Sequence, residues 1–577
     1  MKKYLDYMYS FSQSELKGYL GNNIVDLLVE WMPNGDSLLT KQRMIRMIDC
    51  LYGTNILKNK NFRRDLLLAM EPQQIDEIRD KCLEGNEKSI TEEYQLVEVI
   101  SNKPWNKNRL TQYLLRLWDV EPIIFDKKTD DSVVENVLQN DGERFFELLD
   151  YQYYIKQRTI NIINSGNQQE RLLIHMPTGT GKTKTAMHTI TSYLEFNMDK
   201  QGLVIWIAHT TELLQQAYET FCEVWKHLGD GDIHAYKLWG AKSIDKVDEQ
   251  LNGIVFCGLS KLMSIADTNP VLFERLHRDA RLIVFDEAHK AAATKTQRTI
   301  ENLMRMPAGY ENRALIGLTA TPGRTTEDSY NNNLLSDMFG EKLVSIDANI
   351  LNQINMGSLR ALNLVAENNI IKYFQERKIL AKMKPERLEY QKEFTPAELK
   401  ILGGTLRDLG YGDKEFTSKQ LEVLATNKSR NKSIMQRLRQ LHADKIPTIV
   451  FACSVDHAKM ISAMLTLEDI PNCLVVGDMD PMDRKKAIDT FKDRQSGVDI
   501  IINYEVLTTG FDSKNIRCVF ITRPTKSIIL YSQMLGRGLR GPMMGGNEKC
   551  LLIDVEDNLT AFDNETAFSH FNDYWRV

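Results

Sequence analysis

The sequence lacks long apolar runs and paired cysteines, and both absences exclude classes of protein. No stretch approaches the roughly 20 apolar residues of a membrane helix, and the lysines after Met1 lead into no apolar core of a signal peptide. The eight cysteines lie far apart and form no C-x-x-C pair of the kind that binds zinc or exchanges disulfides. We therefore expect a cytoplasmic protein, without membrane contact, whose cysteines are reduced and mostly buried.

The sequence also has little excess charge of either sign. Its formal net charge is −5 and its pI is near 6.1, so it lacks the strongly basic balance of an obligate nucleic-acid binder. Any nucleic-acid track must therefore be a local basic groove. Internal repeats and low-complexity tracts are missing as well, and 42% hydrophobic and 26% charged residues are typical of a compact globular protein. With 577 residues the chain exceeds one hydrophobic core, so we expect two to four domains.

Short apolar runs separated by amphipathic stretches begin at about residue 145. This pattern is typical of parallel sheets covered by helices on both faces. The runs form two sets, which predicts two α/β lobes, residues 146–340 and 341–577, with a helical insertion at about 395–440 in the second. The runs of the first lobe are 172–174, 203–207, 254–256, 282–285 and 314–318, and those of the second are 448–451, 473–476, 500–502, 518–521 and 551–553.

The first 145 residues have a different pattern. Apolar residues recur at helical spacing, as at Ile24, Leu27, Leu28 and Trp31, and no run indicates a strand. We expect residues 1–145 to form an all-helical accessory domain. It carries no chemical motif, so it either selects a substrate or protein partner or braces the first lobe.

A glycine-rich segment follows the first apolar run and precedes an amphipathic helix. Glycines let backbone N–H groups curl around phosphate oxygens, and the helix N-terminus adds its dipole. An ordinary glycine turn is the alternative, but the order strand, loop, helix favours a phosphate loop. Lys182 would contact the β- and γ-phosphates of ATP, and Thr183 would bind Mg²⁺. The expected cofactor-binding residues of this loop are Pro177, Thr178, Gly179, Thr180, Gly181, Lys182 and Thr183, whereas Met176 replaces the first glycine of the Walker A pattern.

Two carboxylates follow the apolar run 282–285. Parallel sheets bind their ligands at the carboxyl ends of their strands, where Asp286 and Glu287 are expected. Asp286 would hold Mg²⁺ while Glu287 orients and deprotonates the attacking water. A solvated strand end is the alternative. The distance of about 100 residues from the phosphate loop and the following Ala288-His289 favour the catalytic interpretation.

The ordered motifs resemble those of superfamily 2 helicases of the DEAH/DEAD type over about residues 150 to 557. The resemblance implies two tandem RecA-like lobes, and it implies that Gln157 recognises adenine, with Gln152 as a second candidate. Further nucleotide contacts would come from Gly510 and Asp512. By the same resemblance, the nucleic-acid contacts are His209, Thr210, Gly258, Ser260, Ser454, Thr508 and Thr509, and the residues that couple the two sites are His289, Thr319 and Thr321.

Near the C-terminus, Gln533 opens a segment with two arginines, Arg537 and Arg540. Three residues apart, they would face the same way on one helical turn. Arginine suits an arginine finger because its planar group stays charged and can contact γ-phosphate oxygens across a cleft. Two solvated surface arginines are the alternative. The resemblance makes all three residues catalytic.

Within the superfamily, the run 508–512, the segment Arg523-Pro524-Thr525 and the last motif are most similar to RadD-type bacterial repair helicases and to restriction-enzyme (ResIII-like) motor domains. This implies an ATP- and Mg²⁺-dependent helicase or translocase that acts on DNA rather than RNA, in repair or antiviral defence. An ATP-driven clamp, the motor subunit of a multi-chain restriction complex, and an RNA helicase remain alternatives. The sequence contains no acid-acid-Lys cluster typical of a nuclease.

Overall fold

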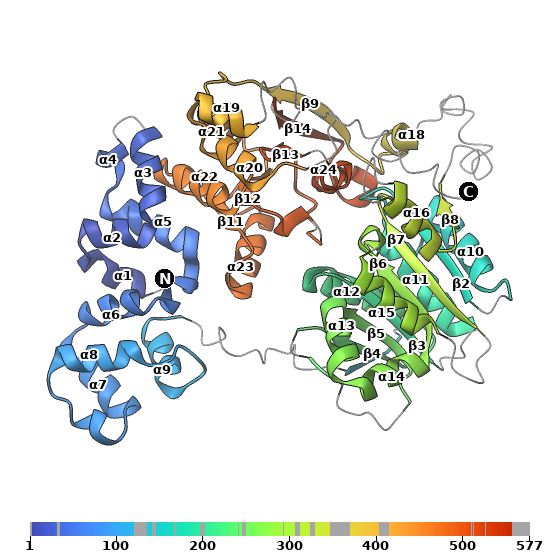
Figure 1. Ribbon diagram of the computed structural model, residues 1–577, viewed down its shortest axis with the longest axis horizontal. Coiled ribbons are helices and arrows are strands. Elements are labelled where there is room, and N and C mark those ends of the chain that lie inside the picture. Colours follow the sequence, from blue (N-terminus) through green and yellow to red (C-terminus); the bar gives the residue numbers. More distant parts are fainter. Residues whose placement is uncertain are drawn as a thin grey trace.

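The computed structural model contains two sheets and a group of N-terminal helices (Figure 1). It describes residues 3–31, 35–120, 135–140, 146–166, 169–196, 202–240, 242–244, 250–291, 293–305, 312–323, 329–346, 370–402, 415–508, 510–511, 513–525 and 527–556.

The first sheet has eight strands in the order β1-β4-β5-β3-β6-β7-β2-β8. Neighbouring strands are parallel except β1 and β4, which pair antiparallel. Its strands are β1 (Glu135–Leu138), β2 (Gln169–His175), β3 (Leu203–Ala208), β4 (Ile233–Leu238), β5 (Gly253–Gly258), β6 (Ala280–Asp286), β7 (Arg313–Thr319) and β8 (Leu343–Ser345).

Helices cover both faces of this sheet. Along the central strand β3, Val204 and Trp206 belong to one buried cluster, and Leu203, Ile205 and Ile207 belong to another, because successive side chains point to opposite faces. The helices of this lobe are α10 (Asp150–Ile163), α11 (Lys182–Phe196), α12 (Thr211–Leu228), α13 (Leu259–Thr268), α14 (Pro270–Asp279), α15 (Thr294–Met304) and α16 (Ser329–Met338).

The second sheet has six parallel strands in the order β11-β12-β10-β13-β14-β9. Its strands are β9 (Lys382–Leu388), β10 (Thr448–Phe451), β11 (Asn472–Val475), β12 (Ile500–Asn503), β13 (Cys518–Ile521) and β14 (Lys549–Val555). Its helices are α18 (Ile370–Glu376), α19 (Pro396–Leu402), α20 (Ser418–Thr426), α21 (Lys428–Ala443), α22 (Val455–Leu467), α23 (Pro481–Lys492) and α24 (Ile528–Leu535).

All ten predicted apolar runs fall on strands of these two sheets, which confirms the α/β class with two tandem RecA-like lobes. Helices α19 to α21 lie where the helical insertion was expected. Strands β4, β8 and β9 were not predicted. Strand β1 lies inside the range 1–145 that was expected to be all-helical, and it extends the first sheet instead.

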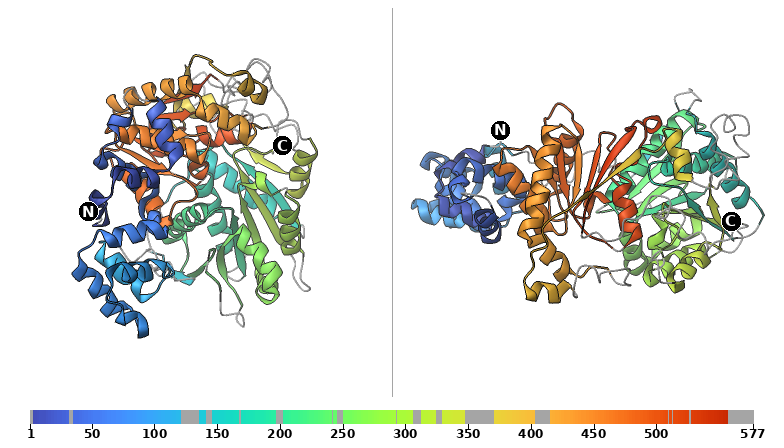
Figure 2. Two further views of the ribbon diagram at one scale, coloured as in Figure 1. Left: turned by 60° about the vertical axis from the view of Figure 1, so that its left-hand side comes forward. Right: turned by 90° about the horizontal axis from the view of Figure 1, so that it is seen from above.

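The N-terminal helices pack against the second lobe. They are α1 (Tyr4–Tyr7), α2 (Gln13–Leu20), α3 (Asn22–Trp31), α4 (Gly35–Leu38), α5 (Lys41–Tyr52), α6 (Lys60–Leu68), α7 (Pro72–Cys82), α8 (Glu93–Asn102) and α9 (Arg109–Leu117). Helix α5 lies on α22, and their side chains Met47, Ile48, Met460 and Met464 share one buried cluster. In Figure 1 and the right panel of Figure 2, the second lobe lies between these helices and the first lobe. The expectation that they brace the first lobe is therefore wrong.

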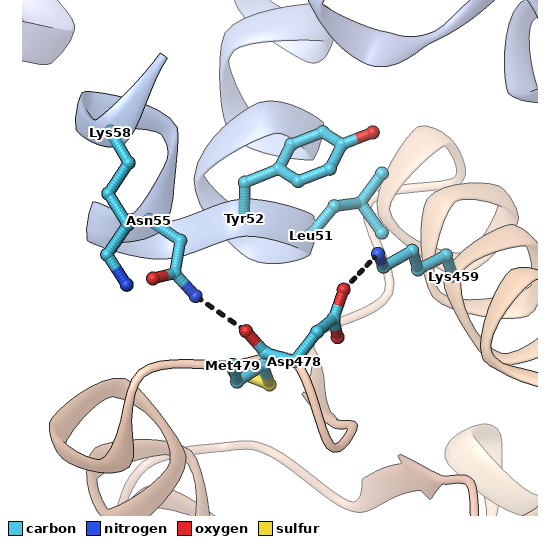
Figure 3. A pocket seen from close by; sticks show the side chains of 7 residues that line it. All are labelled: Leu51, Tyr52, Asn55, Lys58, Lys459, Asp478 and Met479. Atoms are coloured by element: carbon cyan, nitrogen blue, oxygen red, sulfur yellow. Dashed lines mark hydrogen bonds and ion pairs between the residues drawn. The ribbon is translucent and has the colours of Figure 1, made fainter.

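Polar contacts join the N-terminal helices to the start of α23. The backbone N–H and the hydroxyl of Thr54 both donate to Oδ2 of Asp483 at 2.7 Å. Nearby, Asn55 donates to the carbonyl oxygen of Asp478 at 3.0 Å, and Lys459 pairs with the Asp478 carboxylate at 2.9 Å. Figure 3 shows these last three residues around a small pocket of about 250 Å³.

Candidate nucleotide site between the two lobes

The predicted phosphate loop connects β2 to α11. Gly179 and Gly181 have φ angles of 89° and 84°, in the left-handed region that glycine adopts without a steric cost. A Cβ atom on Gly181 would lie 2.3 Å from Nε2 of Gln152, so no side chain fits there without displacing that amide. Lys182 is the first residue of α11. The loop thus presents backbone and a helix N-terminus, which together suit a phosphate group.

The glutamine at this loop is Gln152 and not Gln157. Gln152 is buried, and its Nε2 donates to the carbonyl oxygen of Thr180 at 2.8 Å; the hydroxyl of Tyr151 donates to the same oxygen at 2.7 Å. Gln157 lies five residues further along α10, and five residues turn an α-helix by about 140°. Gln157 therefore points to another side of α10 than Gln152 does, and its recognition of adenine stays a prediction.

The two carboxylates lie at the carboxyl end of β6, as predicted. Nζ of Lys182 is 3.5 Å from Oε1 of Glu287 and 4.0 Å from Oδ1 of Asp286. Burial raises the pKa of Asp286 above its ordinary value. Burial alone would also raise the pKa of Glu287, but Lys182 and the neighbouring His289 and Lys290 lower it, so Glu287 stays ionised.

Glu287 also has an unusual backbone conformation. Its φ angle is 53°, in the left-handed region where a residue with a Cβ atom is strained. Such strain costs about 1–3 kcal/mol and is concentrated at functional sites. The conformation turns the chain sharply after β6 and places Glu287 beside Lys182.

An imidazole links Glu287 to the other predicted coupling residues. Nδ1 of His289 lies 3.4 Å from Oε2 of Glu287 and 3.3 Å from Oγ1 of Thr319. The hydroxyl of Thr319 donates to the carbonyl oxygen of Thr321 at 2.7 Å. From the second lobe, Nε2 of Gln533 approaches Nε2 of His289 to 3.4 Å. The structure thus brings all three coupling candidates and Gln533 together.

The predicted arginine fingers face the same loop, but they do not share a helical turn. Helix α24 ends at Leu535, because Gly536 and Gly538 follow and the chain enters a turn, so the prediction of one helical turn was wrong. A Cβ atom on Gly536 would lie 2.4 Å from Cγ2 of Thr178, so this turn lies directly on the phosphate loop.

The two arginines form different contacts near the site. Nη1 of Arg537 donates to the carbonyl oxygen of Phe511. Burial has the largest effect on the pKa of Glu287 and raises it, Lys182, His289 and Lys290 lower it, and the charge of Arg537 lowers it by a smaller amount. Cγ of Arg540 would lie 3.6 Å from a Cβ atom on Gly179. Arg540 therefore lies against the phosphate loop, whereas the hydrogen bond of Arg537 stays within the second lobe.

Several residues that were predicted to contact nucleic acid form hydrogen bonds with nearby backbone groups through their hydroxyls. Thr210 and Ser454 accept hydrogen bonds from backbone N–H groups as N-caps of α12 and α22, and Thr508 donates to the carbonyl oxygen of Glu505. Ser260 is exposed near the start of α13, and Gly258 is its N-cap. His209 is half-buried, with its ring edge-to-face against Phe285 at 5.6 Å. Thr509 and Asp512 lie outside the described residues.

A contact between the lobes was missed. Arg484 of α23 pairs with Glu212 of α12 at 3.1 Å, and Gly510 lies against the same first turn of α12. The sequence alone does not predict this ion pair, because its two residues are far apart along the chain. The first turn of α12 therefore contacts the second lobe twice, through the ion pair of Glu212 with Arg484 and through packing against Gly510, and sequence reasoning did not find the ion pair.

The donors around the loop suit Mg²⁺ held with substrate phosphates. The hydroxyl of Thr183 and the carboxylate of Asp286 supply hard oxygen ligands, and Mg²⁺ usually needs only one or two carboxylates beside phosphate and water. Among the residues that the structure describes, three or more His, Cys, Asp or Glu side chains nowhere gather as a metal cage. In the same part of the chain, no helix is both long and apolar enough for a membrane span.

Comparisons with known proteins match two parts of the chain that contain these residues. Residues 145–324 match the family "Type III restriction enzyme, res subunit", and residues 430–541 match the helicase conserved C-terminal domain. A homologue named ATP-dependent helicase IRC3, from Saccharomyces cerevisiae, is 24% identical over 70% of this chain and 51% of its own length. The type I restriction enzyme EcoAI endonuclease subunit of Escherichia coli is 24% identical over 72% of this chain and 47% of its own length.

The chain thus spans about half the length of these two relatives. Among solved structures, Saccharomyces cerevisiae Dbp5 bound to RNA and ADP BeF3 aligns with a TM-score of 0.44 and 15% identity, over 73% of this chain and 87% of that chain. The two matched domains contain the phosphate loop, the carboxylates and the arginine segment. The chain belongs to the superfamily 2 helicases related to restriction-enzyme motor domains.

Proposed function

We propose that this chain is an ATP-hydrolysing motor that moves along nucleic acid, with DNA as its substrate. The observation that carries the proposal is that the second lobe contacts the first at the candidate nucleotide site. Gly536 lies against Thr178 of the phosphate loop, and Gln533 approaches His289 beside the carboxylates. A site divided between two lobes couples ATP turnover to their relative movement.

Each residue at the site has a chemical role in this proposal. Lys182 neutralises charge on the β- and γ-phosphates, and Gln152 holds the loop from the side of α10. Glu287 orients the attacking water and accepts its proton, which its ionised state permits. Arg540, with Arg537, stabilises the charge that develops on the transferred phosphoryl group. Mg²⁺, held by Thr183 and Asp286, would supply further charge neutralisation.

Nucleic acid would lie across both lobes and would be held by its backbone. The candidates are exposed Ser260 at α13, the half-buried His209, and the N-terminal ends of α12 and α22, where backbone N–H groups favour phosphates. Backbone contacts give binding that weakens with salt and depends little on base sequence. We place the protein in the cytoplasm and its work in DNA repair or antiviral defence.

A second candidate is the motor subunit of a multi-chain restriction complex. The relatives named as type I restriction enzyme subunits favour it, and this chain covers only about half of the length of one of them. The N-terminal helices, on the second lobe, would then be the docking part for the partner.

The test is ATP turnover by the purified chain with and without nucleic acid. We expect hydrolysis that requires Mg²⁺ and rises with DNA. Strand separation measured on a forked duplex distinguishes a helicase from a translocase or clamp. Hydrolysis that is unaffected by any nucleic acid would contradict the proposal.

A further inference from the structure

A short segment, residues 370–381, runs between α10 of the first lobe and the arginine segment of the second. It consists of α18 and the turn after it. We call it the linking segment. Nη1 of Arg377 donates to Oδ1 and Oδ2 of Asp150 at 2.7 and 2.8 Å, and also to the hydroxyl of Tyr373 at 2.6 Å. Asp150 is the first residue of α10.

The residues after Asp150 hold the phosphate loop. The hydroxyl of Tyr151 donates to the carbonyl oxygen of Thr180, and Gln152 donates to the same oxygen. The ring of Tyr151 packs edge-to-face on Phe374 of the linking segment, with centroids 5.0 Å apart. The linking segment therefore contacts the first turn of α10 through both an ion pair and an aromatic contact.

The other end of the linking segment is bonded to the arginine segment. The N–H of Ala381 donates to the carbonyl oxygen of Leu539 at 2.7 Å, and the N–H of Gly541 donates to that of Ile379 at 2.9 Å. Leu380 forms an antiparallel bridge with Arg540 itself. Cδ2 of Leu380 would lie 3.4 Å from a Cβ atom on Gly179, so the segment also lies on the loop.

We propose that Arg377 and Asp150 form a positioning pair that sets the phosphate loop opposite Arg540. The pair ties the first turn of α10, which holds Thr180, to the backbone that carries Arg540. It touches no phosphate in this proposal, and it acts through Tyr151 and Leu380. The inference rests on the proposed ATP hydrolysis, because its purpose is to align the two halves of that site.

The pair is suited to this task by its partial burial. The Arg377 and Asp150 side chains are 27% and 29% exposed, and one guanidinium nitrogen bonds both carboxylate oxygens. Fully exposed pairs contribute little, whereas a partly buried, charge-assisted contact is stronger. We therefore expect Arg377→Ala to raise the KM for ATP by about three- to tenfold and to lower kcat by a similar factor.

The test uses the full chain with three variants. Glu376→Ala is the matched control, since Glu376 belongs to the linking segment, pairs with Lys382 at 2.8 Å and should change neither constant. Arg377→Ala and Asp150→Ala should have similar effects. The exchange Asp150→Arg with Arg377→Asp should recover part of the activity; recovery is partial because a cation is unfavourable at the start of α10. If the two residues acted only through their size or through the stability of the fold, the exchanged pair would recover no activity.

A second measurement does not depend on hydrolysis. Hydrogen exchange of residues 177–185 in the nucleotide-free chain should be faster in Arg377→Ala than in Glu376→Ala, because Thr180 loses support from α10. If the parent chain hydrolyses ATP and Arg377→Ala keeps its KM, kcat and exchange rate, the positioning pair is refuted while the proposed function stands. If the parent chain shows no hydrolysis, the proposed function fails. The hydrogen-exchange rate alone then tests whether Arg377 and Asp150 hold the phosphate loop in position.

Discussion

Nε2 of Gln533, in the second lobe, lies 3.4 Å from Nε2 of His289, in the first. The other ring nitrogen of His289 faces both Glu287 and Thr319. When His289 accepts a hydrogen bond from the Gln533 amide, its Nδ1 carries the proton and can donate to Glu287. One imidazole thus connects the carboxylate that would activate water to the opposite lobe.

Gln533→Ala should weaken the response to nucleic acid. Losing one hydrogen bond between the lobes costs about 0.5–1.5 kcal/mol, which corresponds to a two- to tenfold decrease in the stimulated kcat. Binding of a fluorescent ATP analogue should change by less than about twofold, because the hydrogen bond of Gln533 to the first lobe goes to His289, beside the carboxylates. A collapse of ATP affinity with an unchanged kcat would make Gln533 a nucleotide ligand instead.

Glu287→Gln should bind ATP and lose hydrolysis by about 10²- to 10⁴-fold, since the amide cannot accept the proton of the attacking water. The variant should remain bound to nucleic acid in the presence of ATP. The control is Glu274→Gln, an exposed glutamate of α14 whose side chain is 75% exposed. If Glu287→Gln hydrolyses ATP at nearly the rate of the parent chain, another residue must accept the proton of the attacking water.

Arg540→Ala should lower kcat by about 10³-fold or more, because arginine fingers act on the charge of the transition state. ATP affinity should fall far less, since Arg540 comes from the opposite lobe. Arg439→Ala is the matched control; Arg439 lies on α21 and pairs with Glu468 at the end of α22. Loss of ATP binding with an unchanged rate at saturation would show that Arg540 binds the ground state.

Asp483→Ala should loosen the N-terminal helices from the second lobe. It leaves the partly buried donors of Thr54 without their acceptor, at a cost of about 1–3 kcal/mol in the free energy of unfolding. Urea unfolding of the full chain measures this cost, with Asp489→Ala, an exposed residue of α23, as the control. Equal stability of the two variants would show that the contact contributes nothing.

The same contact changes what is expected of a chain that lacks residues 1–145. From the sequence alone, such a chain should fold as two lobes and keep ATP turnover. In the structure, α5 covers α22, and removing it exposes apolar side chains such as Met460 and Met464. An unstable or aggregating truncation is now the expected result.

Buried parallel strands were predictable because runs of three to five mostly apolar residues alternate with amphipathic stretches. Strand β9 was missed because Lys382-Met383-Lys384-Pro385 is mostly polar, as an edge strand can be. The contact of Gln152 with the phosphate loop could not be predicted, because spacing along the chain does not say which side of α10 faces the loop. Pairs such as Arg377 with Asp150 depend on tertiary packing alone.

The most direct test of a nucleic-acid motor compares ATP turnover by the parent chain and Glu287→Gln with double-stranded DNA, single-stranded DNA and RNA, side by side at one salt concentration. The account predicts strong stimulation of the parent chain by at least one form of DNA, weaker stimulation by RNA, and turnover at least about 10²-fold lower in the variant. Turnover that is equal with and without every nucleic acid, or that survives in Glu287→Gln, would contradict it.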